Sequence, residues 1–240
     1  MADFEGKIAL VTGASRGIGY HAAKTLAQNG AHVIALARTV GGLEELDDEV
    51  RSVGGSATLV PLDLMEHDAI DRLGDSIFER WQRLDIFVAN AGMLGGLSPI
   101  EHFEPNTFEK VLALNVTSNW RMMRSMSPLL RESESGRVIA LTSSNTAETA
   151  RSFWGAYAAS QAALITLLKT WSHETEKSAI RINMLDPGPT RTALRAQAMP
   201  GEDLQKISHP ASIGKSILHL ASSNLEATGK IYSHIDQRFL

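Results

Sequence analysis

The sequence predicts an α/β fold of the doubly wound class, in which helices cover both faces of a parallel sheet. Short apolar runs alternate with longer stretches of helical period along the whole chain, as expected for parallel strands joined by crossover helices. Several of these runs are apolar for four or five residues without alternation. Such runs are typical of strands buried on both faces, because a strand with one solvated face alternates apolar and polar residues.

Seven strands are expected. We assign them to the runs at 7–13 (KIALVTG), 32–38 (HVIALAR), 57–63 (ATLVPLD), 84–90 (LDIFVAN), 137–143 (RVIALTS), 181–187 (RINMLDP) and 230–236 (KIYSHID). The chain shows no internal repeat and no linker rich in Pro, Gly or Ser. Its 240 residues are therefore expected to form one domain around one seven-stranded parallel sheet.

The segments between the strands have the period of amphipathic helices. In one of them Ile70, Leu73, Ile77 and Trp81 recur at steps of three and four, which predicts a single buried stripe. The segment at about 188–210 is the least regular. Such a segment after a strand of an α/β protein forms a mobile binding loop, so we expect it to contact the substrate.

Composition excludes several kinds of site. The chain has no cysteine, which excludes disulfides, thiolate metal sites and cysteine nucleophiles. Its eight histidines show no H-E-x-x-H or comparable spacing, so no metal site is expected. The net charge is only -4 and no block of Lys and Arg occurs, so nucleic acid is not an expected partner.

The start of the chain carries no targeting signal that we recognise. MADFEGKIALV leads into the first strand without a basic segment and a long apolar one, and no 18-residue apolar span follows. Hydrophobic residues make up 43% of the chain and charged residues 21%, as in an ordinary globular protein. We therefore expect a cytoplasmic protein with no membrane partner.

A glycine-rich turn follows the first strand directly and opens a helix. It reads TGASRGIG and places Gly13, Gly17 and Gly19 in the spacing G-x-x-x-G-x-G. Glycines here let the backbone approach a pyrophosphate, at which the helix N-terminus would point. The alternative is a glycine-rich turn that binds nothing.

Four more motifs follow the turn in order: NAG at 90–92, a serine pair at 143–144, Tyr157, and DPG at 186–188. With these motifs the chain resembles the short-chain dehydrogenase/reductase family over nearly its whole length. NAGMLG, WGAYAAS and PGPTRTALRA are similar to segments of the YciK-type bacterial oxidoreductases within that family. The resemblance implies a single dinucleotide-binding domain of the Rossmann type over 1–240, and an oxidoreductase that acts on a carbonyl or alcohol.

The resemblance also implies which residues hold the dinucleotide. They belong to the glycine turn, to the ends of the second, third and fourth strands, to the helix that carries the tyrosine, and to the segment after the sixth strand. They are Gly13, Ser15, Arg16, Gly17, Ile18, Gly19, Arg38, Asp63, Leu64, Asn90, Ala91, Gly92, Gln161, Pro187, Gly188, Thr190 and Thr192.

The end of the second strand indicates which dinucleotide is bound. A dinucleotide fold places an acidic residue there to bind the ribose 2'-hydroxyl, but this strand ends in Ala37 and Arg38. Arg38 and Arg16 offer two cations to a 2'-phosphate, so we expect NADP rather than NAD. The alternative is that both arginines are solvated surface residues. Asp63 matches the family position that contacts the adenine, or else it caps the helix that follows.

The resemblance implies a catalytic set of four polar residues, Tyr157, Ser144, Asn115 and Gln161. Tyr157 delivers or removes the substrate proton. Ser144 lies thirteen residues before it, where the family's carbonyl-positioning serine stands, and the neighbouring Ser143 is the alternative. Asn115 matches the asparagine that orders a water in the proton path, or it is a structural amide that bridges backbone groups.

The residue four positions after the tyrosine departs from the family pattern. That pattern is Tyr-x-x-x-Lys, in which lysine holds the nicotinamide ribose and lowers the pKa of the tyrosine, but this chain has Gln161. A glutamine amide can bind the ribose but carries no charge. Two functions therefore stay open. One is an NADP(H)-dependent oxidoreductase whose activity Gln161 impairs, and the other is an NADP(H)-binding protein with little or no catalysis, such as a redox sensor or scaffold.

Large apolar residues suggest further contacts. Phe153 and Trp154 before the tyrosine, and Met93 and Leu94 after NAG, stand at family positions that line an apolar pocket for a small-molecule substrate. Core or subunit packing is the alternative use of these side chains.

The fourth and fifth helices are richer in apolar residues than one sheet face needs. One holds Trp120, Met122 and Met123, and the other holds Leu164 and Leu168. In the family these helices pair subunits, so we expect a homodimer or homotetramer.

Overall fold

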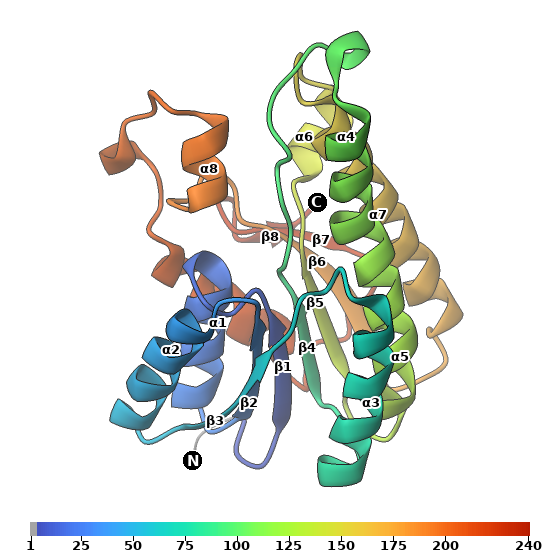
Figure 1. Ribbon diagram of the computed structural model, residues 1–240. Helices are drawn as coiled ribbons and strands as arrows, with labels where there is room; N and C mark the ends of the chain where they lie inside the picture. The colour runs from blue at the N-terminus through green and yellow to red at the C-terminus, as the bar shows by residue number, and fades with distance from the viewer. Residues whose placement is uncertain (1–3) are drawn as a thin grey trace.

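The computed structural model describes residues 4–240, and a single eight-stranded sheet forms its centre (Figure 1). The strand order is β3-β2-β1-β4-β5-β6-β7-β8. The strands are β1 (Ile8–Thr12), β2 (His32–Ala37), β3 (Ser56–Pro61), β4 (Ile86–Ala89), β5 (Arg137–Leu141), β6 (Arg181–Asp186), β7 (Ile231–Ser233) and β8 (Arg238–Phe239). The first seven are parallel, which confirms the predicted class, and β8 is antiparallel to β7. The sequence does not predict β8, because two residues are too few to show a period.

Helices cover both faces of the sheet, as Figure 1 shows. The α-helices of residues 4–240 are α1 (Gly17–Gln28), α2 (Val40–Ser52), α3 (His67–Trp81), α4 (Pro105–Leu112), α5 (Asn119–Arg131), α6 (Ser144–Thr149), α7 (Gly155–Glu174), α8 (Ala193–Ala198) and α9 (Gly214–Ala221). Side chains of α3, α5 and α7 form a core on one face, and those of α1, α2 and α9 form a core on the other. No helix in this described part of the chain combines the length and apolarity that a membrane span requires.

The two cores explain the unbroken apolar runs. In β1, Leu10 belongs to the core on one face, whereas Ala9 and Val11 belong to the core on the other. Successive side chains of a strand point to opposite faces, so a strand covered on both sides is apolar at every position.

The predicted stripe of α3 is buried at Ile70, Leu73 and Ile77, and Trp81 packs partly buried against the same core. That core also contains four of the five apolar residues that suggested subunit pairing, namely Met122, Met123, Leu164 and Leu168. Trp120 is the exception among the five, with 45% of its surface exposed. Most of this apolar surface is therefore used within the chain, and subunit pairing stays a prediction.

The carboxyl ends of the parallel strands meet at one edge of the sheet. β1 and β4 are neighbours there, although β2 and β3 lie between them in the sequence. In an open α/β sheet a ligand binds where the strand order reverses in this way. The predicted loop at 188–210 starts from this edge after β6, contains α8, and is closed by a bridge between Thr190 and Ser208.

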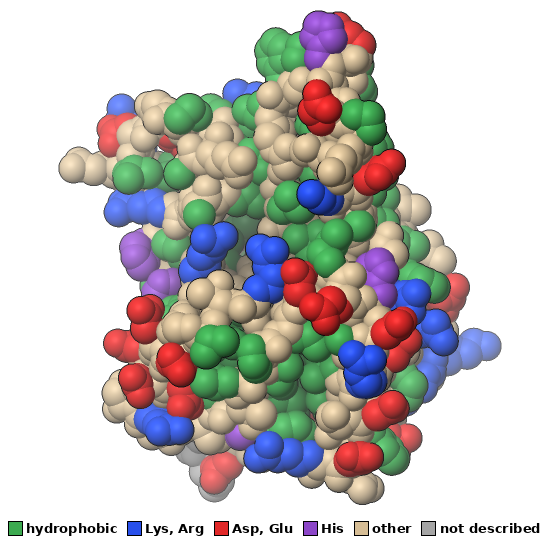
Figure 2. Space-filling view, viewed as in Figure 1, with side chains coloured by type: hydrophobic (Ala, Val, Ile, Leu, Met, Phe, Trp, Pro, Cys, Tyr) green, Lys and Arg blue, Asp and Glu red, His purple; other side chains and the backbone are tan. Residues whose placement is uncertain are grey.

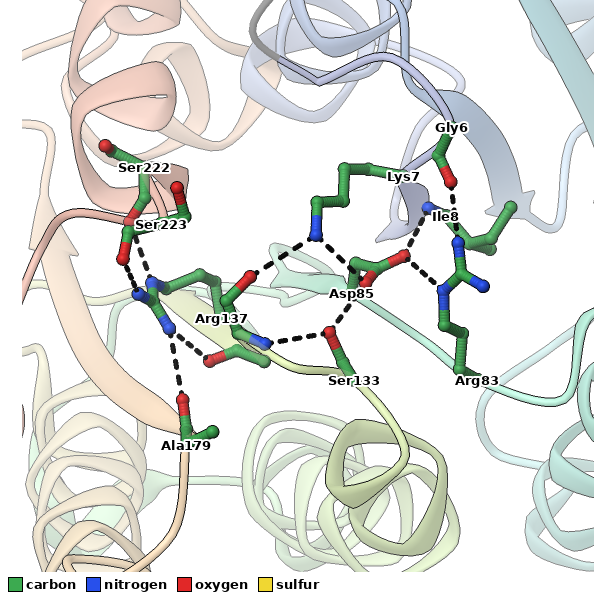
Figure 3. Close-up of polar contacts among 12 residues, drawn as sticks. Gly6, Lys7, Ile8, Arg83, Asp85, Ser133, Arg137, Ala179, Ser222 and Ser223 are labelled. Carbon is green, nitrogen blue, oxygen red and sulfur yellow. Dashed lines mark hydrogen bonds and ion pairs between the residues drawn. The ribbon is translucent and has the colours of Figure 1, made fainter.

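At the opposite edge, a buried carboxylate is held by donors from several segments (Figure 3). The side chain of Asp85 is 2% exposed, and its Oδ2 accepts the N–H of Ile8 at 2.9 Å and Arg83 Nε at 3.2 Å. Its Oδ1 accepts Ser133 Oγ at 2.6 Å and lies 3.5 Å from Lys7 Nζ. Burial raises the pKa of Asp85, but the donors and the charge of Lys7 outweigh burial, so the pKa is lowered overall.

Arg137 joins the neighbouring strands at the same edge. Its buried guanidinium donates to the carbonyl oxygens of Gly136, Ala179, Ser222, Ser223 and Leu225. These carbonyls belong to the residue before β5, to the segment after α9 and to the segment before β6, so one side chain joins three parts of the fold. Burial, with the charge of Arg181, lowers the pKa of Arg137 to about 10.

We expect Asp85→Asn to lower the free energy of unfolding at pH 7 by about 3 kcal/mol, because it removes the carboxylate on which buried donors converge. The charge of Asp85 stabilises the fold above the pKa of an unfolded aspartate, about 3.9, and this stability is lost as pH falls through the lower pKa of the folded state. The free energy of unfolding, measured by urea denaturation across this pH range, should therefore depend less on pH in the variant than in the unaltered protein. Asp71→Asn is the control, since Asp71 is 44% exposed beside Arg121, and it should cost less than about 1 kcal/mol. Equal losses in the two variants would contradict the expectation.

Candidate active site

A cavity of about 1390 Å³ opens at the carboxyl edge of the sheet. It exceeds the roughly 300–1,000 Å³ of pockets for drug-sized ligands, so it has room for a dinucleotide and a substrate together. Figure 2 shows the molecule hollowed there, with Lys or Arg side chains at the edge of the hollow. Every residue predicted to act in catalysis or to hold the dinucleotide lines this cavity except Gly19. Within residues 4–240, no three His, Asp or Glu side chains are grouped so that they would hold a metal ion.

The glycine turn between β1 and α1 takes up backbone conformations that glycine favours. Gly13 and Gly17 have φ angles of 66° and 60°, in the left-handed region. A Cβ atom on Gly19 would lie 2.4 Å from both Asn90 Nδ2 and the Gly13 carbonyl oxygen. Glycine is therefore required at position 19 for a structural reason, because a side chain there would prevent α1 from approaching the end of β4.

The N-terminus of α1 is open to an anion. The helix begins at Gly17, and its N-cap residue Arg16 makes no side-chain cap hydrogen bond. The first N–H groups of a helix have no acceptor within the helix and carry a partial positive charge. Ser15, Arg16, Gly17 and Ile18 all line the cavity. The turn thus fits the phosphate-binding role that the sequence predicts for it.

Thr12 and Asn90 fix the position of the NAG segment. The hydroxyl oxygen of Thr12 accepts the N–H groups of Asn90 and Ala91, at 3.0 and 3.1 Å. Asn90 Nδ2 donates to the carbonyl oxygens of Thr12 and Gly13, at 2.9 and 3.2 Å. These bonds join the ends of β1 and β4 and set the shape of the cavity between them. Sequence reasoning missed Thr12, whose only signal is a hydroxyl residue that ends a buried strand.

Arg38 and Asp63 lie at the ends of β2 and β3. Arg38 Nη1 is 3.7 Å from Asp63 Oδ2, and the two side chains are 67% and 33% exposed. Asp63 Oδ1 accepts the N–H of Met65 at 2.9 Å and so closes a turn, whereas the N-cap of α3 is Glu66. The alternative role of Asp63 as the cap of α3 is therefore not found, and its adenine contact stays a prediction. Arg38 lines the cavity together with Arg16.

Tyr157 and Gln161 lie one turn apart near the start of α7, and both line the cavity. Gln161 is only 5% exposed, and its Oε1 accepts the N–H of Ser143 at 2.9 Å. This bond fixes the orientation of the amide. Its Nε2 donates to no other residue within 4–240 and is left for a ligand in the cavity.

Ser144 is held by a carboxylate that the sequence did not single out as a site residue. Asp186 ends β6, and its Oδ2 accepts the N–H of Ser144 at 2.9 Å and the Ser144 hydroxyl at 2.5 Å. Its Oδ1 accepts the N–H of Gly188 at 2.9 Å. The hydroxyl that we expected to donate to a substrate oxygen thus donates to Asp186. The signal that points to Asp186 is an acidic residue between a buried strand and Pro187.

The surroundings of Tyr157 disfavour its ionised form. Burial is the larger cause and the charge of Asp186 the second, and together they raise the pKa of Tyr157 to about 12. The phenol is therefore a neutral O–H donor at neutral pH. An aromatic contact with Trp154, with ring centroids 6.1 Å apart, holds the ring.

Asn115 lies in a π-helical turn, Ala113–Ser118, and is 1% exposed. Its Oδ1 accepts the N–H of Met93 at 2.9 Å, and its Nδ2 donates to Met93 O and to Ser160 Oγ, both at 2.9 Å. The side-chain amide thus serves as the structural bridge that we considered as its alternative role. Leu64 is joined to the same turn, since its carbonyl oxygen accepts Ser118 Oγ at 2.7 Å. The water-ordering role of Asn115 stays a prediction.

The segment after β6 returns to the cavity. Gly188 has a φ of 62°, and the hydroxyl of Thr190 lies 3.3 and 3.2 Å from the carbonyl oxygens of Pro187 and Gly188. Thr192 caps α8, since its Oγ1 accepts the N–H of Arg195 at 3.1 Å. The hydroxyl proton of Thr192 remains available to a ligand in the cavity.

An apolar cluster lies beside Tyr157. It joins Leu94, Trp154 and Ala198, so that α8 packs against the start of α7. Among the residues predicted to form an apolar substrate pocket, Trp154 lines the cavity, whereas Leu94 is buried in the cluster and Phe153 is 56% exposed.

Comparison with known proteins identifies the family. The sequence profile described as short chain dehydrogenase matches residues 7–203. The chain belongs to the short-chain dehydrogenase family. The uncharacterised oxidoreductase YciK of Escherichia coli (strain K12) is 37% identical to it over 210 residues, which are 86% of this chain and 82% of YciK. These matches confirm the family that the motifs indicated.

Two solved structures of the short-chain dehydrogenase family are similar to this chain almost from end to end. One is a short chain dehydrogenase of Shigella flexneri 2a in complex with NADP, with a TM-score of 0.93, 34% identity, and coverage of 98% of this chain and 100% of that one. The other is from Escherichia coli CFT073 in complex with NADPH, with a TM-score of 0.91, 34% identity, and coverage of 98% and 99%. Both are complexes with a phosphorylated nicotinamide dinucleotide.

We expect Tyr157 to titrate well above the reference tyrosine pKa of about 10, because its folded-state pKa is raised to about 12. The chain has three tyrosines, so NMR of carbon-labelled tyrosine resolves each one, and Tyr157→Phe assigns the signal. Asp186→Asn should lower this pKa without restoring the reference value, since burial remains. A Tyr157 signal that shifts near pH 10 in the unaltered protein would show that the site does not disfavour tyrosinate.

Proposed function

We propose that the chain is an NADP(H)-dependent oxidoreductase that acts on a small molecule, a carbonyl compound or the corresponding alcohol. The observation that carries this proposal is one cavity that brings together an uncapped helix N-terminus, two arginines and the Tyr157–Ser144 pair. Membership of the short-chain dehydrogenase family supports the reaction class. The NADP and NADPH complexes of similar structures support the choice of dinucleotide.

The residues of the cavity fit a dinucleotide, as the glycine turn and the open N-terminus of α1 indicate. We assign the pyrophosphate to that N-terminus and the 2'-phosphate to Arg16 and Arg38. Gln161 stands where the family has lysine, and we assign its Nε2 to the nicotinamide ribose. When bound, the nicotinamide ring supplies or takes up the hydride.

Tyr157 is assigned the proton transfer. Its raised pKa keeps the phenol protonated, so it suits the role of acid in the reduction of a carbonyl. With a pKa of about 12, only roughly one molecule in 100,000 carries tyrosinate at pH 7. Alcohol oxidation needs tyrosinate as the base, so the proposed direction at neutral pH is reduction.

The second candidate is an NADP(H)-binding protein with little or no catalysis. The neutral Gln161 and the carboxylate of Asp186 favour it, because neither supplies the positive charge that activates a tyrosine. Titration with NADPH, followed by a panel of ketones and aldehydes, separates the two candidates. Tight binding without hydride transfer would favour the second.

We expect NADPH to bind at least about tenfold more tightly than NADH, because two guanidinium groups pair with the 2'-phosphate. Calorimetry with both dinucleotides measures this preference. Arg16→Ala together with Arg38→Ala should abolish it, whereas Arg51→Ala, which alters an arginine paired with Asp47 on α2, should leave it unchanged. Equal affinities in the unaltered protein would remove the phosphate-binding role from Arg16 and Arg38.

Tyr157→Phe should abolish carbonyl reduction while NADPH affinity changes less than about threefold, because the hydroxyl acts on the substrate and not on the dinucleotide. Single-turnover NADPH oxidation measures the first quantity, and quenching of protein fluorescence by NADPH measures the second. Undiminished carbonyl reduction would exclude Tyr157 as the proton donor.

A further inference from the structure

The carboxylate of Asp186 gives the reacting end of the cavity a negative charge. Building on the proposed function, we infer that this site takes a substrate with a positively charged carbon–nitrogen double bond, an iminium ion, in preference to a ketone of similar shape. Three features lead to this substrate class: the direction of the Ser144 hydroxyl, the carboxylate that holds it, and the neutral amide of Gln161.

The Ser144 hydroxyl faces the substrate as an acceptor. Its single proton is donated to Asp186 Oδ2 at 2.5 Å, so its remaining capacity is two lone pairs. A ketone oxygen requires a donor and gains nothing from these lone pairs. The N–H of an iminium ion is a donor, and the two groups are complementary.

Asp186 can also accept one more donor. A carboxylate has about four lone-pair sites, and three of them are used by the Ser144 N–H, the Ser144 hydroxyl and the Gly188 N–H. Asp186 lines the cavity, so its charge acts on a ligand that binds there. A hydrogen bond between a cationic N–H and a carboxylate is about twice as strong as one between neutral groups.

No side chain of residues 4–240 pairs with this charge, since no Lys, Arg or His among them forms an ion pair with Asp186. The arginines that line the cavity have other neighbours or lie at the glycine turn. Arg38 pairs with Asp63, and Arg195 pairs with Glu202. Arg191 donates to the Ile207 carbonyl, Arg151 lies over the ring of Trp154, and Arg16 is the N-cap residue of α1 in the glycine turn. The residue one turn after Tyr157 is the uncharged Gln161. A cationic substrate therefore supplies the ion-pair partner that Asp186 lacks.

Reduction of an iminium ion does not require Tyr157 to transfer a proton. A hydride from the dinucleotide of the proposed function adds to the carbon, a C–H bond forms, and the C=N π pair moves onto nitrogen. The nitrogen already carries its proton, so the product is a neutral amine and no proton is transferred in this step. A tyrosine that stays neutral, with no lysine beside it, is compatible with this reaction.

The test compares a methylpyrroline, a cyclic imine, with cyclopentanone, a ketone of similar size, with NADPH at pH 7. The unaltered protein should reduce the imine with a kcat/KM at least about tenfold higher. Asp186→Asn should abolish this preference, and Gln161→Lys, which adds a cation, should reduce it as well. Asp71→Asn, which removes an exposed carboxylate on α3, is the control and should retain it.

Calorimetry supplies a second measurement that does not depend on turnover. Pyrrolidine, which is a cation at pH 7, should bind the NADP complex of the unaltered protein about tenfold more tightly than that of Asp186→Asn, while cyclopentanol should bind both equally. Faster reduction of the ketone, with no loss of pyrrolidine affinity in Asp186→Asn, would overturn the inference and leave the proposed function standing. NADPH binding without hydride transfer to either compound would overturn both.

Discussion

Three hydrogen bonds from the ends of β5 and β6 converge on the carboxylate of Asp186, and the geometry of the candidate site depends on them. The N–H and hydroxyl of Ser144 bind one oxygen, and the N–H of Gly188 binds the other. They hold the start of α6 against the segment that leads to α8. The same carboxylate sets the direction of the serine proton. It is also the second cause, after the larger effect of burial, of the raised pKa of Tyr157. Asp186 thus determines both the position of Ser144 and the negative charge beside Tyr157.

Polar and charged groups are divided between the two edges of the parallel sheet. At the amino edge, Asp85 and Arg137 are buried among several partners and stabilise the chain connections. At the carboxyl edge, the N-terminus of α1, Gln161 Nε2 and one lone-pair site of Asp186 remain available to ligands. The first edge suits stability and the second suits binding, which is the arrangement expected of an open α/β sheet.

The sequence predicts the fold and most of the cavity, because strand periodicity and the glycine turn fix which residues reach the carboxyl edge. Gly19 shows the first limit of prediction from the sequence, because glycine is required there by the close approach of Asn90 and not by a ligand. Asp186 shows the second, because the side chain that meets it depends on the spacing of β5 and β6 and not on distance along the chain. Met122 and Leu164 show the third: an apolar helix residue does not reveal whether the sheet or a second subunit covers it.

The position of one proton tests this account most directly. A neutron diffraction structure of the perdeuterated protein with bound NADP would show the deuterium on Ser144 Oγ. We expect that deuterium to point at Asp186 Oδ2, with the oxygen–oxygen separation near the 2.5 Å of the present structure and a second deuterium on the phenol of Tyr157. A Ser144 deuterium directed at Tyr157 or into the cavity, with Asp186 turned away, would contradict the account, because the serine would then be a donor to substrate and the site would no longer be an acceptor of cations.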